Sequence, residues 1–324
     1  MNFSREKDWR AELAHIDPRA AAAPLGPHAA RLLEANGRTA AAAAVYRELC
    51  QRSPADARLQ RELAALLRRL GRLVEAREAL REACRLEVDR LGIDPADQEE
   101  VAAYLTAREC GDEVPEKAPA AYVQVLFDRA AGDLDERLSS LEYRGPQLLV
   151  EAIERRVGPG ARLASVLDAG CGTGLAAQLL RPMADRLEGI DLSPGVLRKA
   201  SETGLYDALA VAELGSALAE RRGLALIFAA DVFCYLGNLG PVLAGCRRAL
   251  GPAGLLAFSV EAAAAPRDGI GYRLGASGRY AHAEAYLRAS LAEAGFEEIS
   301  IESAVVRREA GRPVDSLLGL AALP

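Results

Sequence analysis

Short apolar runs alternate with amphipathic stretches over the second half of the chain. The runs are rich in Leu, Ile, Val and Ala, as in buried strands, and the stretches between them carry apolar residues at the spacing of one helix face. Strands that alternate with helices in this way form parallel sheets with right-handed crossovers. The predicted strands span residues 164–169, 187–191, 208–212, 224–231 and 254–260, and the predicted helices span residues 175–181, 194–202, 216–222 and 239–250.

The end of the chain departs from this alternation. After a predicted helix at residues 283–294, segments 298–307 and 313–321 flank a turn that contains Gly311, which predicts an antiparallel hairpin. A dinucleotide-binding dehydrogenase would continue with another parallel unit instead. The predicted fold class is therefore α/β, a Rossmann-like sheet of seven strands whose last strands form an antiparallel hairpin.

The N-terminal third has a helical pattern that repeats. Residues 26–59 align with residues 60–93 when they are offset by 34 positions, and small residues and a glycine then coincide. Small residues let antiparallel helices approach closely, and the glycine opens the turn between them. The aligned pairs are Ala30 with Ala64, Leu33 with Leu67, Gly37 with Gly71, and Ala42 with Ala76. A further helix at residues 97–108 is expected to cap this array.

This order and period resemble the tetratricopeptide repeat. The alternative is a generic pair of helical hairpins. The resemblance implies an all-α, tetratricopeptide-like repeat domain over residues 1–110, with a possible peptide or protein partner on its surface. Residues 111–120 mix Pro, Gly and charge and are predicted as a linker, and residues 121–324 form the α/β domain.

Composition narrows the classes of protein that fit. The length of 324 residues favours two domains, and the formal net charge of −6 without a dense basic run argues against a nucleic-acid partner. The N-terminus lacks the apolar core of a signal peptide and no apolar run has transmembrane length, so a cytoplasmic protein without a membrane partner is expected. The six cysteines form no Cys-x-x-Cys pair and the three histidines are dispersed, so no metal site is predicted.

The strongest local motif is VLDAGCGTGL, residues 166–175, at the end of the first predicted strand. An acid at the carboxyl end of a buried strand is followed by a glycine-rich turn into a helix. Without Cβ atoms the backbone of such a turn can approach a ligand closely, and the helix N-terminus offers free N–H groups. The candidate cofactor-binding residues here are Asp168, Ala169, Gly170, Cys171, Gly172 and Gly174.

Two cofactors compete for this motif. Residues 172–177 also fit the G-x-G-x-x-A dinucleotide fingerprint, which leaves an NAD-dependent oxidoreductase as an alternative. The acid that precedes alternating glycines resembles instead the first motif of class I S-adenosylmethionine-dependent methyltransferases, and the C-terminal hairpin agrees. Segments around Tyr122–Asp128, Tyr143–Pro146, Gly278–Phe296 and Val306–Pro313 extend the resemblance to bacterial predicted methyltransferases with N-terminal tetratricopeptide repeats. The resemblance implies S-adenosyl-L-methionine as cofactor.

Acids also follow the later predicted strands. Asp191 ends the second strand, where a carboxylate can accept both hydroxyl groups of a ribose, with Leu192 beside it; the alternative is an acid that only supports the helix capped by Ser193-Pro194. By resemblance, Glu213 or Leu214 borders the adenine. Asp231 and Glu261 end the fourth and fifth strands, and the ligands of open α/β sheets bind at these carboxyl ends.

Methyl transfer needs a general base only if the acceptor must lose a proton. The predicted catalytic candidates are Asp231 and His282, and Tyr235 and Glu284 are weaker ones. The chain reads Ala-Asp-Val-Phe after the fourth strand, without the Asn-Pro-Pro-Tyr signature of amide and nucleobase amine methylation, so another small-molecule or protein acceptor is expected. A scaffold protein that binds the cofactor without turnover is the remaining alternative.

Overall fold

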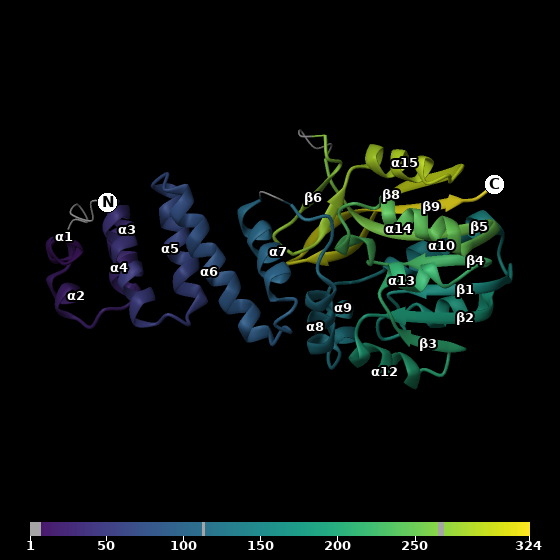
Figure 1. The fold of residues 1–324 in the computed structure, drawn as a ribbon, viewed down its shortest axis with the longest axis horizontal. Helices are drawn as coiled ribbons and strands as arrows, with labels where there is room; N and C mark the ends of the chain where they lie inside the picture. Colours follow the sequence, from purple (N-terminus) through teal and green to yellow (C-terminus); the bar gives the residue numbers. More distant parts are fainter. Residues whose placement is uncertain (1–7, 112–113, 265–268) are drawn as a thin grey trace. The chain divides into compact units, whose positions relative to one another are not determined.

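The computed structural model describes residues 8–111, 114–264 and 269–324 (Figure 1). The chain divides into two compact units, Met1–Asp112 and Glu113–Pro324. Within the described ranges, none of the helices has the length and apolarity that crossing a membrane requires.

The first unit is entirely helical. The small residues that repeat in the sequence lie inside it: Ala30, Ala42, Ala64 and Ala76 are at most 2% exposed, which lets successive helices pack closely. Gly37 has φ +73°, so the chain turns there in the left-handed region that glycine tolerates. The helices are α1 (Trp9–Ile16), α2 (Pro18–Ala22), α3 (Pro27–Ala35), α4 (Thr39–Arg52), α5 (Ala57–Arg69), α6 (Leu73–Leu91) and α7 (Gln98–Cys110). The repeat pattern thus predicted helices α3–α7, whereas α1 and α2 were not predicted.

The second unit is built on one mixed sheet (Figure 1). Its parallel part has the order β3-β2-β1-β4-β5, and β9 pairs antiparallel with both β5 and β8. These strands are β1 (Leu163–Ala169), β2 (Ala184–Asp191), β3 (Ala208–Val211), β4 (Leu224–Ala229), β5 (Leu250–Ala262), β8 (Glu298–Glu309) and β9 (Arg312–Ala322). The five predicted parallel strands and the final antiparallel hairpin are confirmed.

The sheet has nine strands where seven were predicted. The additional strands are β6 (Tyr272–Leu274) and β7 (Tyr280–His282), which pair with each other antiparallel, while β7 pairs parallel with the end of β5. Each is three residues long. Strands this short carry no periodicity that a sequence pattern could reveal.

Helices cover both faces of the sheet. Helices α10 (Gly145–Val157) and α11 (Ala177–Leu180) pack on one face, where Leu149, Ile153 and Leu180 join Phe228 of β4 in one apolar core. Helices α13 (Leu214–Ala219), α14 (Gly240–Ala249) and α15 (Glu284–Glu293) pack on the other, with α12 (Pro194–Glu202) against β2 and β3. Two buried cores around one sheet make the carboxyl ends of its strands a rigid platform.

Residues 115–118, which were predicted as part of a linker, pack on the second unit instead. Their backbone and that of the loop after β4 form a short ladder, which includes the bridge between Lys117 and Leu236. The hydrogen bonds join Ala118 N to Tyr235 O at 2.8 Å, Gly237 N to Glu116 O at 2.7 Å, and Tyr280 Oη to Pro115 O at 2.8 Å. The polar composition that suggested a linker therefore marks a strap, because its backbone groups find partners in this unit.

Candidate functional site

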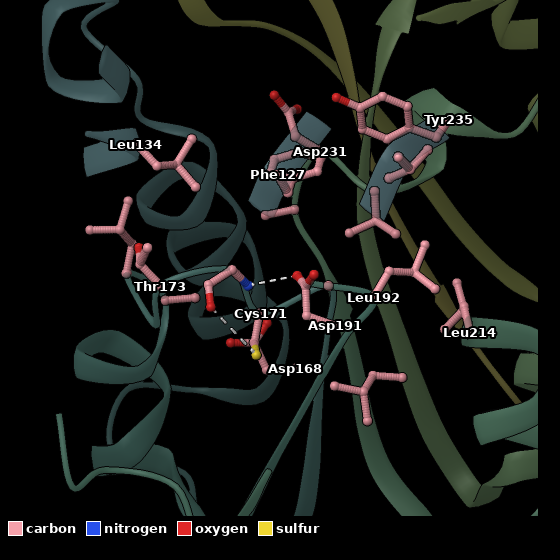
Figure 2. A pocket seen from close by; sticks show the side chains of 18 of the residues that line it. Phe127, Leu134, Asp168, Cys171, Thr173, Asp191, Leu192, Leu214, Asp231 and Tyr235 are labelled. Atoms are coloured by element: carbon pink, nitrogen blue, oxygen red, sulfur yellow. Dashed lines mark hydrogen bonds between the residues drawn. The ribbon is translucent and has the colours of Figure 1, made fainter. Parts of the chain in front are cut away.

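A pocket lies at the carboxyl ends of β1, β2 and β4 (Figure 2). Helices α8 (Ala120–Ala130) and α9 (Leu134–Ser140) contribute one wall and the strap at residues 115–118 another. Nine of the predicted site residues line this pocket: Asp168, Gly170, Cys171, Gly172, Asp191, Leu192, Glu213, Leu214 and Asp231. Residues from four separate strand ends thus meet in one cavity, as open α/β sheets require.

The glycines of the turn after β1 have different reasons to be glycine. All three have positive φ. A Cβ on Gly170 would lie 2.4 Å from Cγ2 of Val232, so the Val232 side chain occupies the space that a side chain on residue 170 would need. A Cβ on Gly174 would meet Thr203 and Tyr206 at 3.3 Å, on the side of α12. Only at Gly172 would a Cβ meet nothing within 4 Å. Of the three glycines, only Gly172 therefore leaves open space in which a ligand can approach the backbone closely.

Two predicted cofactor-binding residues do not line the pocket. Ala169 is fully buried in the core of the sheet, and Gly174 packs against α12. The helix after the turn is also shorter than predicted: α11 has four residues and passes into a 3₁₀ turn at Arg181–Met183. Pro182 lacks the N–H that would continue an α-helix.

Asp191 joins the two predicted motifs. Its Oδ2 accepts a hydrogen bond from Gly172 N at 3.0 Å (Figure 2), and its Oδ1 accepts one from Ser193 N at 2.9 Å. Ser193 caps α12 by accepting from Val196 N, as predicted. Burial raises the pKa of Asp191 above its ordinary value, while these backbone donors favour its ionised form. The carboxylate therefore positions the glycine turn and still borders the pocket.

Asp168 is the most deeply buried acid of the site, with 2% exposure. Its Oδ2 accepts a hydrogen bond from the Tyr206 hydroxyl at 2.6 Å. Burial raises the pKa of Asp168 to about 7, and the nearby Asp191 carboxylate raises it further while Tyr206 opposes the shift. A carboxylate that is costly to ionise in this way is stabilised by a cation that enters the pocket.

Glu213 has two partners within the unit. Its Oε2 accepts from Ser216 N at 3.0 Å and so caps α13, and its Oε1 lies 3.8 Å from Nζ of Lys117 on the strap. Leu214, Leu192 and Ala212 supply apolar surface beside it. A flat base fits between such side chains with an acceptor at its edge.

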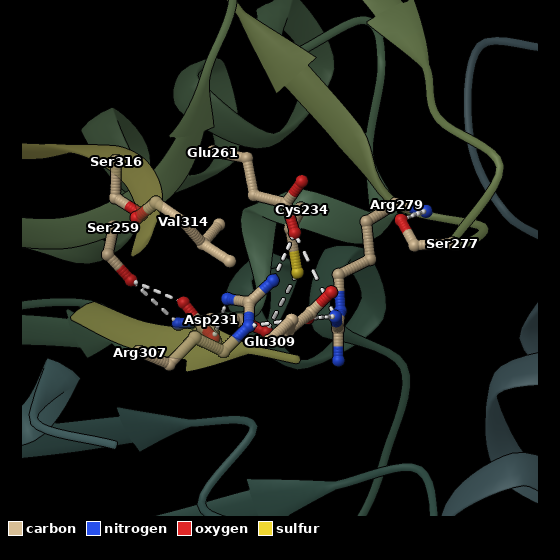
Figure 3. Close-up of polar contacts among 10 residues, drawn as sticks. All are labelled: Asp231, Cys234, Ser259, Glu261, Ser277, Arg279, Arg307, Glu309, Val314 and Ser316. Carbon is tan, nitrogen blue, oxygen red and sulfur yellow. Dashed lines mark hydrogen bonds and ion pairs between the residues drawn. The ribbon is translucent and has the colours of Figure 1, made fainter. Parts of the chain in front are cut away.

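Asp231 has φ +55°, a strained conformation for a residue other than glycine. Its Oδ2 accepts from Nη1 of Arg307 at 2.9 Å, and the Ser259 hydroxyl lies between its Oδ1 and its backbone N (Figure 3). Arg307 is 1% exposed and also pairs with Glu261 and Glu309. The carboxylate of Asp231 is thus held in an ion pair with a buried guanidinium and in a hydrogen bond with Ser259.

His282 does not line the pocket. Its ring is fully buried, Nε2 lies 3.1 Å from the Gly237 carbonyl oxygen, and Tyr286 stacks on it. Burial lowers the pKa of His282 to about 4. The structure therefore argues against the predicted catalytic role, because the ring cannot reach an acceptor in the pocket. Of the weaker candidates, Tyr235 lines the pocket, whereas Glu284 pairs with Arg288 on the surface of α15.

Several pocket residues were not predicted. They come from the strap, from α8, α9 and the loop that follows α9, and from the β6–β7 hairpin: Lys117, Phe127, Leu134, Leu138, Tyr143 and Arg279. Asp128 of α8 accepts hydrogen bonds from Ser193 and Gly195, and Asp135 of α9 accepts from Thr173 at 2.5 Å, which fixes both helices over the glycine turn. The segments of Phe127 and Tyr143 resembled the methyltransferase family, and this was the available signal.

The donor set suits S-adenosyl-L-methionine. Gly172 leaves a cradle that a Cβ would fill, and Asp168 and Asp191 provide carboxylates for an ammonium group and a ribose. Within the described part of the chain, no group of three or more His, Cys, Asp or Glu residues could hold a metal ion.

Comparisons of the sequence point to the same class of protein. A family model described as a methyltransferase domain matches residues 141–301. Human methyltransferase-like protein 27 is 41% identical over 91 residues, 28% of this chain and 37% of that protein. The malonyl-[acyl-carrier protein] O-methyltransferase of Serratia marcescens is 29% identical over 141 residues, 44% of this chain and 53% of that protein. The matched regions therefore span about half or less of these relatives.

A comparison of structures supports the fold alone. The solved structure of the [4+2]-cyclase SpnF is similar with a TM-score of 0.52 at 17% identity, over 65% of this chain and 98% of that one. Since that protein is described as a cyclase, the fold by itself does not specify methyl transfer. The sheet, the family match and the curated relatives together support a methyltransferase domain in the second unit, and the pocket suits S-adenosyl-L-methionine as its cofactor.

Proposed function

We propose that this protein transfers a methyl group from S-adenosyl-L-methionine to a small-molecule or protein acceptor. The observation that carries the proposal is the joining of the two sequence motifs through the hydrogen bond from Gly172 N to the Asp191 carboxylate, at the edge of one pocket. Two of the curated relatives are named as malonyl-[acyl-carrier protein] O-methyltransferases, which favours an oxygen acceptor.

The residue roles follow from the chemistry of the pocket walls. Asp191 accepts the ribose hydroxyls, Glu213 and Leu214 border the adenine, and Asp168 pairs with the ammonium group. Bound S-adenosylmethionine supplies a methyl group on a sulfonium sulfur, which a nucleophile takes by in-line displacement. The protein then acts mainly by orienting the acceptor and excluding water, for which α8 and α9 are placed over the turn.

The first unit has a separate proposed role. We infer that its helical repeats are tetratricopeptide-like and bind a peptide or protein partner. The small residues buried between α3, α4, α5 and α6 at the repeat spacing support this inference.

Calorimetry with adenosylhomocysteine tests the cofactor assignment. The wild type should bind it and should not bind NAD, and Asp191→Asn should weaken binding at least about 100-fold because it loses a charged acceptor of two hydroxyl groups. Glu202→Gln on α12, an exposed acid near the site, is the matched control and should bind as the wild type does. Unchanged binding by Asp191→Asn would refute the ribose role, and binding of NAD instead would favour an oxidoreductase.

Turnover separates an enzyme from a scaffold. The full chain is incubated with S-adenosylmethionine and a cell extract divided into metabolite and protein fractions, and the release of adenosylhomocysteine is measured. Release with either fraction supports the proposal and identifies the acceptor class. Tight cofactor binding without release in any fraction would favour the scaffold.

A further inference from the structure

The end of the pocket next to Asp231 has a distinct chemistry. Tyr143, Tyr235 and Arg279 line it together with Asp231, and Figure 2 shows Asp231 and Tyr235 apart from Asp168. In the sheet order, β4 lies on the opposite side of β1 from β2 and β3. A nucleoside held by Asp191 over β2 therefore directs its reacting end toward β4, so these residues face the acceptor.

The side chains of this end are hydrogen-bond donors. Burial raises the pKa of both Tyr143 and Tyr235, so their hydroxyl groups stay protonated at neutral pH. Arg279 is held in place by Glu309, whose Oε1 lies 3.0 Å from its Nη1 (Figure 3). Both ion pairs of Arg279 join its Nη1 to a carboxylate, and the side chain carries further N–H groups on Nε and Nη2.

The acids near this end are engaged in ion pairs. Arg307 binds Asp231 and Glu261 and shares Glu309 with Arg279, and of these three acids only Asp231 lines the pocket. No histidine is found among the described residues that line it. An alcohol, phenol or ammonium acceptor would need a base to remove its proton, whereas an acceptor that is already an anion would not.

We propose that the methyl acceptor is an organic carboxylate, bound by Arg279 with the hydroxyl groups of Tyr143 and Tyr235 and methylated on oxygen. This inference rests on the proposed function. A lone pair of the carboxylate oxygen forms the O–CH₃ bond while the S–CH₃ bond breaks, and the bonding pair stays on sulfur. No proton moves, and the products are a neutral methyl ester and the neutral thioether of adenosylhomocysteine.

The shape of the Arg279 guanidinium agrees with this acceptor. The guanidinium fork matches the two oxygens of a carboxylate, and burial strengthens such a pair. The reaction also removes one negative and one positive charge, so a pocket walled by Phe127, Leu134 and Leu138 favours its progress over the charged reactants.

Alkali treatment of the methylated product distinguishes acceptor classes. The full chain is incubated with S-adenosylmethionine carrying a tritiated methyl group and with the extract fractions described above. Methyl esters release volatile tritiated methanol in mild alkali, whereas methyl ethers, amines and C-methyl products do not. Label released as methanol is the expected result. Label that stays with the acceptor would overturn the carboxylate inference and leave the proposed function intact, and no transfer of label would count against both.

Substitution of the guanidinium tests the role of Arg279. Arg279→Gln should lower kcat/KM for formation of the base-labile product about 10- to 100-fold, the range for a hydrogen bond to a charged group. Arg279→Lys should recover part of this loss. Arg273→Gln, at an exposed arginine on β6, is the matched control and should behave as the wild type.

The affinity for adenosylhomocysteine, measured by calorimetry, shows that each variant is folded. It should be the same in Arg279→Gln as in the wild type. If base-labile product forms at the wild-type rate in Arg279→Gln, Arg279 does not bind the acceptor.

Discussion

Asp168 should make the cofactor-free protein less stable as the pH rises. Its pKa of about 7, against 3.8 for the free side chain, means that the folded state retains a proton that the unfolded state has lost between these values. The unfolded state therefore binds fewer protons in this window, and stability falls as the pH rises from about 4 to about 7. The difference between the two pKa values corresponds to about 4 kcal/mol at pH 8.

Asp168→Asn removes this effect with little change of shape. The amide oxygen can still accept the Tyr206 hydroxyl bond that Oδ2 accepts at 2.6 Å in the wild type. At pH 8 the variant should be more stable than the wild type by up to ~4 kcal/mol, or a rise in Tm of roughly 10 °C for a domain of this size. Near pH 4.5 most of the gain should vanish, because this pH is only slightly above the pKa of 3.8 for the free side chain, so ionisation stabilises the unfolded state only a little.

The assay is scanning calorimetry of the full chain without cofactor at several pH values. Trp9, the only tryptophan of the chain, lies in α1, so its fluorescence follows the first unit separately and serves as an internal control. Adenosylhomocysteine should bind more weakly to the variant, since the carboxylate charge is lost. Equal stability of wild type and variant at pH 8, or a larger gain at pH 4.5, would refute the reasoning about Asp168.

Two further predictions concern the glycine turn and the buried histidine. Gly170→Ala should lower the Tm by several degrees, because its Cβ would lie 2.4 Å from Val232. Gly172→Ala should have a Tm closer to that of the wild type but should bind adenosylhomocysteine poorly, since its Cβ enters open space at the pocket. Calorimetry measures both the Tm and the affinity, and equal Tm values for the two variants would contradict this prediction. His282→Gln should reduce the loss of stability on acidification from about pH 6.5 to about pH 4. In this range the histidine of the unfolded state becomes protonated, whereas the buried ring, with its pKa of about 4, stays neutral. Denaturant titrations at both pH values check this, and an unchanged pH dependence would show that the ring titrates normally.

Much of the second unit was predictable because its signals are local. Each parallel strand is a continuous apolar run, and the acid and glycines of residues 168–174 follow one such run directly. The carboxyl ends of parallel strands meet at one edge, so Asp168, Asp191 and Asp231 could be expected in one pocket, and they line it.

Other features depend on contacts between segments far apart in the chain. Arg307 and Asp231 are 76 residues apart, and neither position has a pattern that announces the pairing. The same holds for Arg279, carried by a hairpin whose strands are too short to predict, and for the strap at residues 115–118, whose composition is that of a linker. His282 is the opposite case. A histidine in a sequence suggests a reactive side chain, but this one is packed in the interior, away from the pocket.

The sequence by itself thus determined the succession of strands and helices along the chain and the glycine-rich character of the turn after the first strand, since apolar periodicity and backbone freedom are properties of neighbouring residues. Only the tertiary structure decided which acids are free and which are paired, because that depends on the cations that folding brings beside them. The character of the acceptor end, where donors line the pocket and Arg307 holds Asp231, belongs to this second group.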